Sequence, residues 1–131
     1  MAYRLENNPV HLGLGASALI EPEFTGDMNW YALYSERHAT DGAEGRLVSM
    51  HHFTESWASW EMHPKGSGVV ICTAGEMTLI QELPDKPEAR TTICAGEFVI
   101  NPPGVWHTAD VDGTASALFI TAGEGTQHRE R

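Results

Sequence analysis

The chain has 131 residues, of which 41% are apolar, and this is the size and composition of one globular domain with a single core. Eighteen acidic residues against eight basic ones give a formal net charge of −10. Nucleic acid and anionic membranes bind clustered Lys and Arg, so this charge argues against both as partners. No apolar run approaches the roughly 18 residues of a membrane span.

Residues 1–45 are expected to form an N-terminal arm and a short helix. Asp27 can cap a helix over Asn29–His38, where aromatic and aliphatic side chains recur at helical spacing. We expect this helix to pack on the outside of the main body or across a partner subunit. The arm before it, from His11 to Ile20, is rich in small and apolar residues.

Residues 46–122 show short strand-like segments separated by turn residues, which indicates an all-β sandwich or barrel. Turns are expected at Gly75-Glu76 and Gly96-Glu97, and an exposed hairpin loop at Pro84–Glu88. Residues 123–131 are expected to be a polar tail, ordered only where it makes contacts. The predicted strands are Arg46–Phe53, Trp57–His63, Val69–Ala74, Met77–Leu83, Ala89–Cys94, Phe98–Ile100, Val105–Val111 and Ala115–Thr121.

Two stretches carry side chains that can bind a metal or a ligand. Glu61 and His63 are two residues apart on a predicted strand, so they project from the same face. Further along, Pro102-Pro103-Gly104 forces a bend that delivers His107 onto the next strand. Two imidazoles and one carboxylate form a set that can hold iron(II) or a similar divalent ion.

The segment Gly96–His107 matches the pattern G-x5-P-x-G-x2-H and resembles the second motif of the cupin superfamily. Glu61–Gly75 resembles the first motif, H-x-H-x3,4-E-x6-G, in order and length. The strand pattern extends this resemblance from Arg46 to Thr121. It implies an all-β, cupin-like jelly-roll or double-stranded β-barrel, with the N-terminal arm and short helix outside it. In cupins, the motifs carry three histidines and one glutamate that hold a divalent metal inside the barrel.

Carried over residue by residue, the resemblance places His107 at the histidine of the second motif and His63 at the second histidine of the first. Glu61 stands in place of the first histidine. The usual glutamate falls near Ser67 or Gly68, and neither replaces it as a strong ligand. Two hypotheses therefore stay open. Either Glu61, His63 and His107 hold a divalent metal (Fe, Mn, Ni or Zn), or the pocket is free of metal.

Four further residues are candidates for the wall of the pocket. His51 and His52 are neighbours on a predicted strand, so one of them must face inward. Trp57 shares its face with Glu61 and is either a core residue or a stacking surface for a ligand. Gln81 is a candidate polar contact in an otherwise apolar cavity.

The resemblance implies a small-molecule ligand, although the fold does not decide what is done with it. One hypothesis is a metal-dependent enzyme, oxygenase-like or isomerase-like, that uses the Glu/His/His site. The alternative is a metal-free binding or sensor protein with a vestigial site. Exposed strand edges are usually covered, and the arm could cover one across a two-fold axis. We therefore expect a homodimer.

Two features bear on the location of the protein. Cys72 and Cys94 both lie in strand-like segments, and we expect free, buried thiols, as in a reducing compartment. Ala16-Ser17-Ala18 resembles a signal-peptide cleavage site, but no continuous apolar stretch precedes it. The sequence therefore predicts a cytoplasmic protein.

Overall fold

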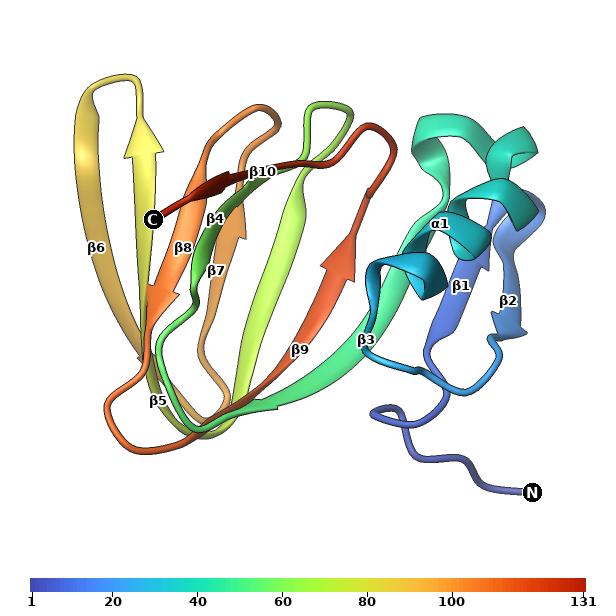
Figure 1. Cartoon of the computed structure of the whole chain (residues 1–131), viewed down its shortest axis with the longest axis horizontal. Coiled ribbons are helices and arrows are strands. Elements are labelled where there is room, and N and C mark those ends of the chain that lie inside the picture. Colours follow the sequence, from blue (N-terminus) through green and yellow to red (C-terminus); the bar gives the residue numbers. More distant parts are fainter.

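A computed structural model describes all 131 residues as two antiparallel sheets that share one long strand (Figure 1). The strands are β1 (Val10–Gly13), β2 (Ser17–Ile20), β3 (Arg46–Phe53), β4 (Ser59–Met62), β5 (Gly68–Leu83), β6 (Lys86–Cys94), β7 (Phe98–Asn101), β8 (His107–Asp110), β9 (Ala115–Thr121) and β10 (Gln127–Glu130). The helices are α1 (Met28–Arg37) and two 3₁₀ segments, Leu14–Ala16 and Ala39–Glu44.

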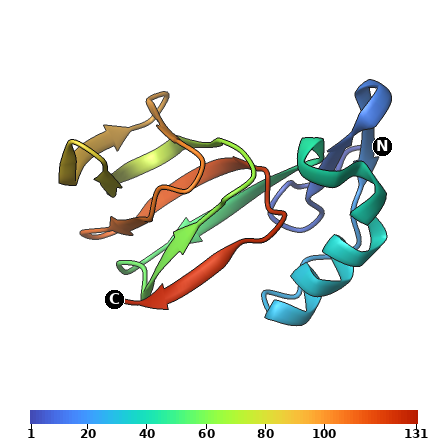
Figure 2. The ribbon, with the colours of Figure 1, turned by 90° about the horizontal axis from the view of Figure 1, so that it is seen from above.

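The two sheets make the layers of a jelly roll. One has the order β7–β5–β9–β3–β1–β2, and the other has the order β6–β5–β8–β4–β10. Figure 2 shows α1 at one side of the strands, on the side of the molecule that carries the N-terminal hairpin. The predicted all-β, cupin-like architecture is confirmed. Neither α1 nor the 3₁₀ segments are long and apolar enough to cross a membrane.

The structure of strand β5 differs from the prediction at one point. The predicted turn at Gly75-Glu76 is wrong, because the chain runs through these residues as one continuous strand. The register against β9 shifts between Cys72 and Ala74, and Gly75 has a φ of 72°. A Cβ at Gly75 would lie 2.1 Å from the carbonyl oxygen of Thr114, so only glycine fits there. The glycine marks a bulge at which β5 passes from one sheet to the other.

Other local predictions agree closely with the structure. Strands β3 and β9 have the expected bounds, and the Asp27 carboxylate caps α1 by accepting a hydrogen bond from the backbone N–H of Trp30 at 2.9 Å. The loop expected at Pro84–Glu88 is shorter, since β6 already begins at Lys86.

Both ends of the chain join the sheets. Strands β1 and β2 form a hairpin whose first strand pairs with β3 of the same chain, so the arm extends its own sheet. The segment expected as a polar tail contains β10, which pairs with β4. The N-terminal hairpin and the C-terminal strand therefore lie at opposite ends of the strand order.

The hydrophobic core lies between the sheets and is built from β5 to β9, with Phe53, Trp57 and Phe119 packed against it. Cys72 is fully buried in this core and is a free thiol. Cys94 is also free, but the expectation of burial is wrong for it: its side chain is exposed and its thiol donates to the Glu97 carboxylate. The buried core residues are Val70, Cys72, Met77, Leu79, Ile93, Val99, Ala109, Val111, Ala115 and Ala117.

Candidate metal centre

A cavity of about 740 Å³ opens beside the core, within the range that holds small-molecule ligands. Its walls come from β3, β4, β9, the C-terminal segment and one side of α1. Phe53, Trp57 and Phe119 separate it from the core. Its lining includes Met28, Tyr31, Tyr34, Ser49, His51, His52, Phe53, Trp57, Glu61, His63, Phe119, Thr126 and His128.

The structure brings Glu61, His63 and His107 together. Glu61 lies on β4 directly opposite His107 on β8, and His63 follows the end of β4. The Nε2 atoms of His63 and His107 lie 4.0 and 3.9 Å from the two Glu61 carboxylate oxygens. One ligand atom from each of the three residues lies within 4.8 Å of the others. Both histidines are buried, whereas the Glu61 side chain is 32% exposed toward the cavity.

The protonation of His107 follows from its hydrogen bond. Its Nδ1 lies 3.1 Å from the carbonyl oxygen of Val105, which can only accept. The proton of the neutral ring is therefore on Nδ1, and the lone pair on Nε2 points to the Glu61 side of the site.

The protonation of His63 follows from a chain of two hydrogen bonds. The Thr126 hydroxyl donates its single proton to the carbonyl oxygen of Gly123 at 2.8 Å. The same hydroxyl oxygen lies 2.8 Å from His63 Nδ1, and it can only accept there because its proton is already used. His63 therefore also carries its proton on Nδ1 and presents a bare Nε2.

The resulting donor set suits a cation. Burial is the main cause that lowers the pKa of both His63 and His107 below the usual value, so both rings are neutral at pH 7. Two imidazole lone pairs and a carboxylate then face one another, with no ring proton directed between them. Histidines held through Nδ1 by a backbone carbonyl or a hydroxyl, with Nε2 free, have the arrangement of metal-binding imidazoles. The residues present therefore fit a divalent metal.

Gly68, one of the two positions at which the resemblance places the cupin glutamate, is buried beside His63. Gly68 pairs with Asn101 across β5 and β7. A Cβ at Gly68 would lie 3.9 Å from His63 Cδ2 and 3.7 Å from the carbonyl oxygen of Ile120, both ordinary contact distances. No protein group at this position completes the coordination of a metal.

His51 and His52 both border the cavity, at different depths. The His51 ring packs among Phe24, Phe53 and Phe119, and burial lowers its pKa. His52 is exposed, and its Nδ1 lies 2.8 Å from the Ser116 hydroxyl. His51 is thus the more enclosed of the two.

Trp57 lines the cavity and also contacts the core. Its ring packs against Phe53 and Phe119 and lies edge-on to His107 at a centroid distance of 6.4 Å. Its indole Nε1 is buried and has no hydrogen-bond partner. Trp57 thus contacts both the core and His107 of the candidate metal centre.

Gln81 does not line the cavity. Its side-chain amide donates to the carbonyl oxygen of Ile100 at 2.9 Å and to Oδ1 of Asn101 at 2.8 Å. Gln81 also pairs with His107 across β5 and β8. Its observed contacts therefore tie β7 to the sheet that carries His107.

Most of the lining residues were not among the sequence candidates, and three of them bear on the chemistry of the site: Tyr31, Thr126 and His128. Burial, followed by the Glu61 charge, raises the pKa of Tyr31 to about 12, so its hydroxyl stays protonated. Thr126 and His128 belong to the C-terminal segment, whose place in the fold depends on a strand pairing. No spacing pattern in the sequence predicts that strand pairing.

Solved structures of other proteins share the fold of this chain at low sequence identity. No protein-family model and no curated protein sequence matches the chain. A cupin superfamily protein from Desulfitobacterium hafniense matches with a TM-score of 0.50 at 16% identity, over 58% of this chain and 65% of that one. Hydroquinone 1,2-dioxygenase from a Sphingomonas species, with 4-hydroxybenzoate bound, matches with a TM-score of 0.50 at 13% identity, over 58% and 59%. An oxalate oxidase matches with a TM-score of 0.52 at 18% identity, over 62% and 44%.

Proposed function

The chain has the cupin fold, and we propose that it is a small cupin that binds a divalent metal through Glu61, His63 and His107 and takes a small molecule in the adjoining cavity. The observation that carries this proposal is the hydrogen bonding of the two histidines at Nδ1. Both rings are held at Nδ1 by groups that can only accept, so both Nε2 lone pairs face the Glu61 carboxylate. A cation is the natural partner of such a set.

The favoured activity is that of an oxygenase-like or isomerase-like enzyme. A divalent ion at this site would polarise a ligand oxygen or support oxygen chemistry, depending on the metal. The protein itself offers a protonated Tyr31 as a donor to a ligand, and an aromatic wall at Phe53, Trp57 and Phe119. The fold neighbours that act on hydroquinone and oxalate support this choice, since both ligands are small and carry oxygen donors.

The alternative function is a metal-free binding or sensor protein with a vestigial site. The observation that favours it is Ser67-Gly68, which stand where the resemblance places the usual glutamate and offer no strong ligand. The cavity and its donors would then serve ligand recognition alone. Metal binding decides between the two functions.

The test uses protein purified without chelator and without a histidine tag. Calorimetric titration with Mn²⁺, Zn²⁺, Ni²⁺ and, under anaerobic conditions, Fe²⁺ should show one site per chain. His63→Ala and His107→Ala should abolish that binding. His52→Ala is the matched control, because it removes an imidazole that borders the same cavity outside the three-residue set, and it should leave affinity unchanged. Wild-type protein that binds none of these ions would support the sensor alternative.

We also propose a homodimer in the cytoplasm. Strand β2 is an edge of its sheet, and the hairpin exposes Leu12, Leu14, Leu19 and Ile20. An exposed apolar edge strand is one that proteins usually cover, and a second copy of the chain would do so. Cys72 and Cys94 are unpaired, which supports a reducing compartment.

A further inference from the structure

We propose that His128, on the C-terminal strand β10, is a fourth ligand of the metal centre. This inference rests on the proposed metal binding and adds a residue that neither cupin motif contains. With His128, the set becomes three imidazoles and one carboxylate.

The strand register directs His128 to the site. Strands β10 and β4 pair antiparallel, with His128 opposite Glu61 and Arg129 opposite Trp60. Side chains alternate between the two faces of a strand, so His128 and Glu61 share the cavity face while Arg129 and Trp60 share the other. The Arg129 guanidinium lies 5.0 Å from the Trp60 ring centre and 4.6 Å from that of Trp106. These two cation–π contacts oppose a slip of one residue, which would turn His128 away.

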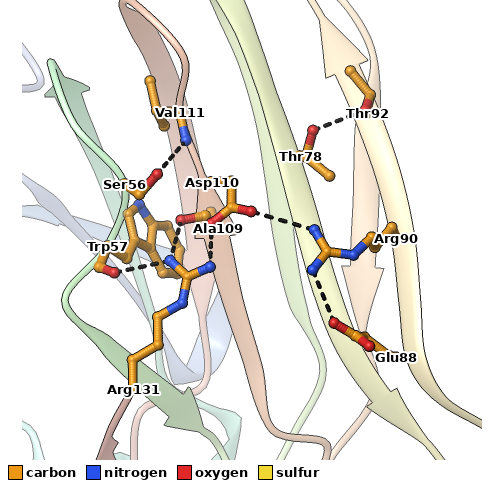
Figure 3. A network of polar contacts seen from close by, with 10 residues as sticks. All are labelled: Ser56, Trp57, Thr78, Glu88, Arg90, Thr92, Ala109, Asp110, Val111 and Arg131. Carbon is orange, nitrogen blue, oxygen red and sulfur yellow. Dashed lines mark hydrogen bonds and ion pairs between the residues drawn. The ribbon is translucent and has the colours of Figure 1, made fainter.

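The end of the same segment is anchored as well (Figure 3). The Arg131 guanidinium donates to the carbonyl oxygens of Trp57 and Ala109 at 3.0 and 3.2 Å, and it pairs with the Asp110 carboxylate. Asp110 is itself held by Arg90 from β6. The contacts of Arg129 and Arg131, which follow His128 in the sequence, therefore fix β10 against the sheet that carries Glu61 and His107.

The distances place His128 within reach of the metal set. Its Nε2 lies 3.5 Å from Glu61 Oε1, the oxygen that also faces His63 Nε2, while Oε2 faces His107. Three imidazole nitrogens thus lie within 4.0 Å of the Glu61 carboxylate, and the mutual 4.8 Å grouping contains only those of His63 and His107. The side chain of His128 is 42% exposed and borders the cavity, so it can move onto an ion held by the other three groups. An ion held by three protein groups keeps at least one coordination position open for a further ligand.

The experiment compares metal-free wild-type protein with His128→Asn and with His52→Asn as the matched control. Each is titrated with Co²⁺ by calorimetry and visible absorption. Wild type should bind one Co²⁺. His128→Asn should bind it more weakly by at least the ~10–100-fold that loss of an outer-shell partner already costs, with a changed absorption spectrum. His52→Asn should match wild type in both measurements.

Two outcomes separate this inference from the proposed function. If wild type binds no Co²⁺, the metal centre itself is refuted. If wild type binds Co²⁺ and His128→Asn binds it equally well with the same spectrum, the metal centre stands and His128 is only an ion-pair partner of Glu61. Pulsed EPR of the wild-type Cu²⁺ complex covers the case of a variant that unfolds. Three coordinated imidazoles are expected, and two would overturn the assignment.

Discussion

The Thr126 hydroxyl determines which nitrogen of His63 is free to bind an ion. Its one proton is given to the Gly123 carbonyl oxygen, so its oxygen accepts from His63 Nδ1. Without that acceptor, the proton could move to Nε2 and remove the lone pair from the site. A threonine outside both sequence motifs thus sets the chemistry of a residue inside one of them.

We expect Thr126→Val to weaken divalent-metal binding by roughly 10–100-fold, the usual effect of losing an outer-shell partner of a metal-binding histidine. Valine keeps the shape of threonine and cannot accept a hydrogen bond from the ring. Thr126→Ser keeps the hydroxyl and should bind metal as wild type does. Calorimetry with Mn²⁺ measures the effect. Equal affinities for the valine and serine variants would show that the hydroxyl does not control the ring.

At Gly68 we expect a substitution that increases metal affinity. Gly68→Glu should raise Mn²⁺ or Fe²⁺ affinity, because a carboxylate there adds charge and an oxygen ligand beside His63. The Cβ position meets only ordinary contacts, so the backbone accepts the change. The gain should vanish in a His107→Ala background, where the new carboxylate lacks its partner. Calorimetry on the single and double variants is the measurement, and no gain in the single variant would contradict the prediction.

At the scale of elements, β10 completes the wall that carries Glu61 and His107. Its backbone pairs with β4, and Arg129 and Arg131 attach it on the outer face. Hydrogen bonding from Arg131, aided by Arg90, holds the pKa of Asp110 below its usual value. The Asp110 carboxylate thus holds the C-terminal segment in place through its ion pair with Arg131.

This anchor predicts a pH-dependent stability difference. A carboxyl whose pKa is lowered by folding stabilises the protein above its unfolded pKa, and it loses that effect as the pH falls through the folded value. Arg131→Ala should therefore lower the melting temperature at pH 7. The difference from wild type should shrink below about pH 4, where unfolded aspartate becomes protonated. Thermal melts between pH 3 and pH 7 measure it. A difference that stays constant across this range would contradict the role of Asp110.

The sequence predicted most elements because alternation and turn residues are local signals. Strands β3 and β9 and the cap at Asp27 were predicted in this way. Gly75 was misread because a glycine between two apolar runs looks like a turn, and only the carbonyl of Thr114 shows why a bulge needs it. Strand β10 was missed because its polar residues alternate between two surfaces, one of them the cavity.

In the candidate site, too, residues with a local sequence signal were predicted, and residues placed only by tertiary structure were not. Glu61, His63 and His107 were found because they lie in or beside the two motifs, with a defined spacing. Thr126 and His128 have no spacing relative to those motifs, and their nearness depends on the register between β10 and β4. Gln81 was assigned to the pocket by its face on β5, yet its amide is taken up by β7. The position of a residue along a strand predicts which face of the sheet its side chain lies on, but it does not predict which group the side chain contacts.

At the scale of the whole molecule, the fold divides into a packed half and a hollow half. The core occupies the space between β5 and its neighbours, while the cavity lies among β3, β4, β9 and α1. The N-terminal hairpin continues the sheet beyond β3 and ends at an exposed edge. This edge lies away from β4, β8 and β10 in the strand order, so pairing there would leave the metal centre intact.

We therefore expect assembly and metal binding to be separable. Light scattering should give twice the mass of one chain at micromolar concentration. Ile20→Lys, on the exposed edge of β2, should yield a monomer with unchanged Mn²⁺ affinity, because a charge there opposes edge pairing. Phe98→Lys, which changes an exposed apolar residue on β7, is the control and should leave the dimer intact. A wild-type protein with the mass of one chain would refute the homodimer.

The placement of Thr126 and His128 decides when the proposed metal site can be completed. Glu61, His63 and His107 are synthesised well before the C-terminal segment, and contacts between distant parts of a chain form late because closing a long loop costs entropy. A nascent chain that still lacks β10 offers two histidines, one of them with an unfixed ring proton. Full affinity arises only after β10 has docked. On the proposed function, the complete donor set is therefore present only in the folded chain.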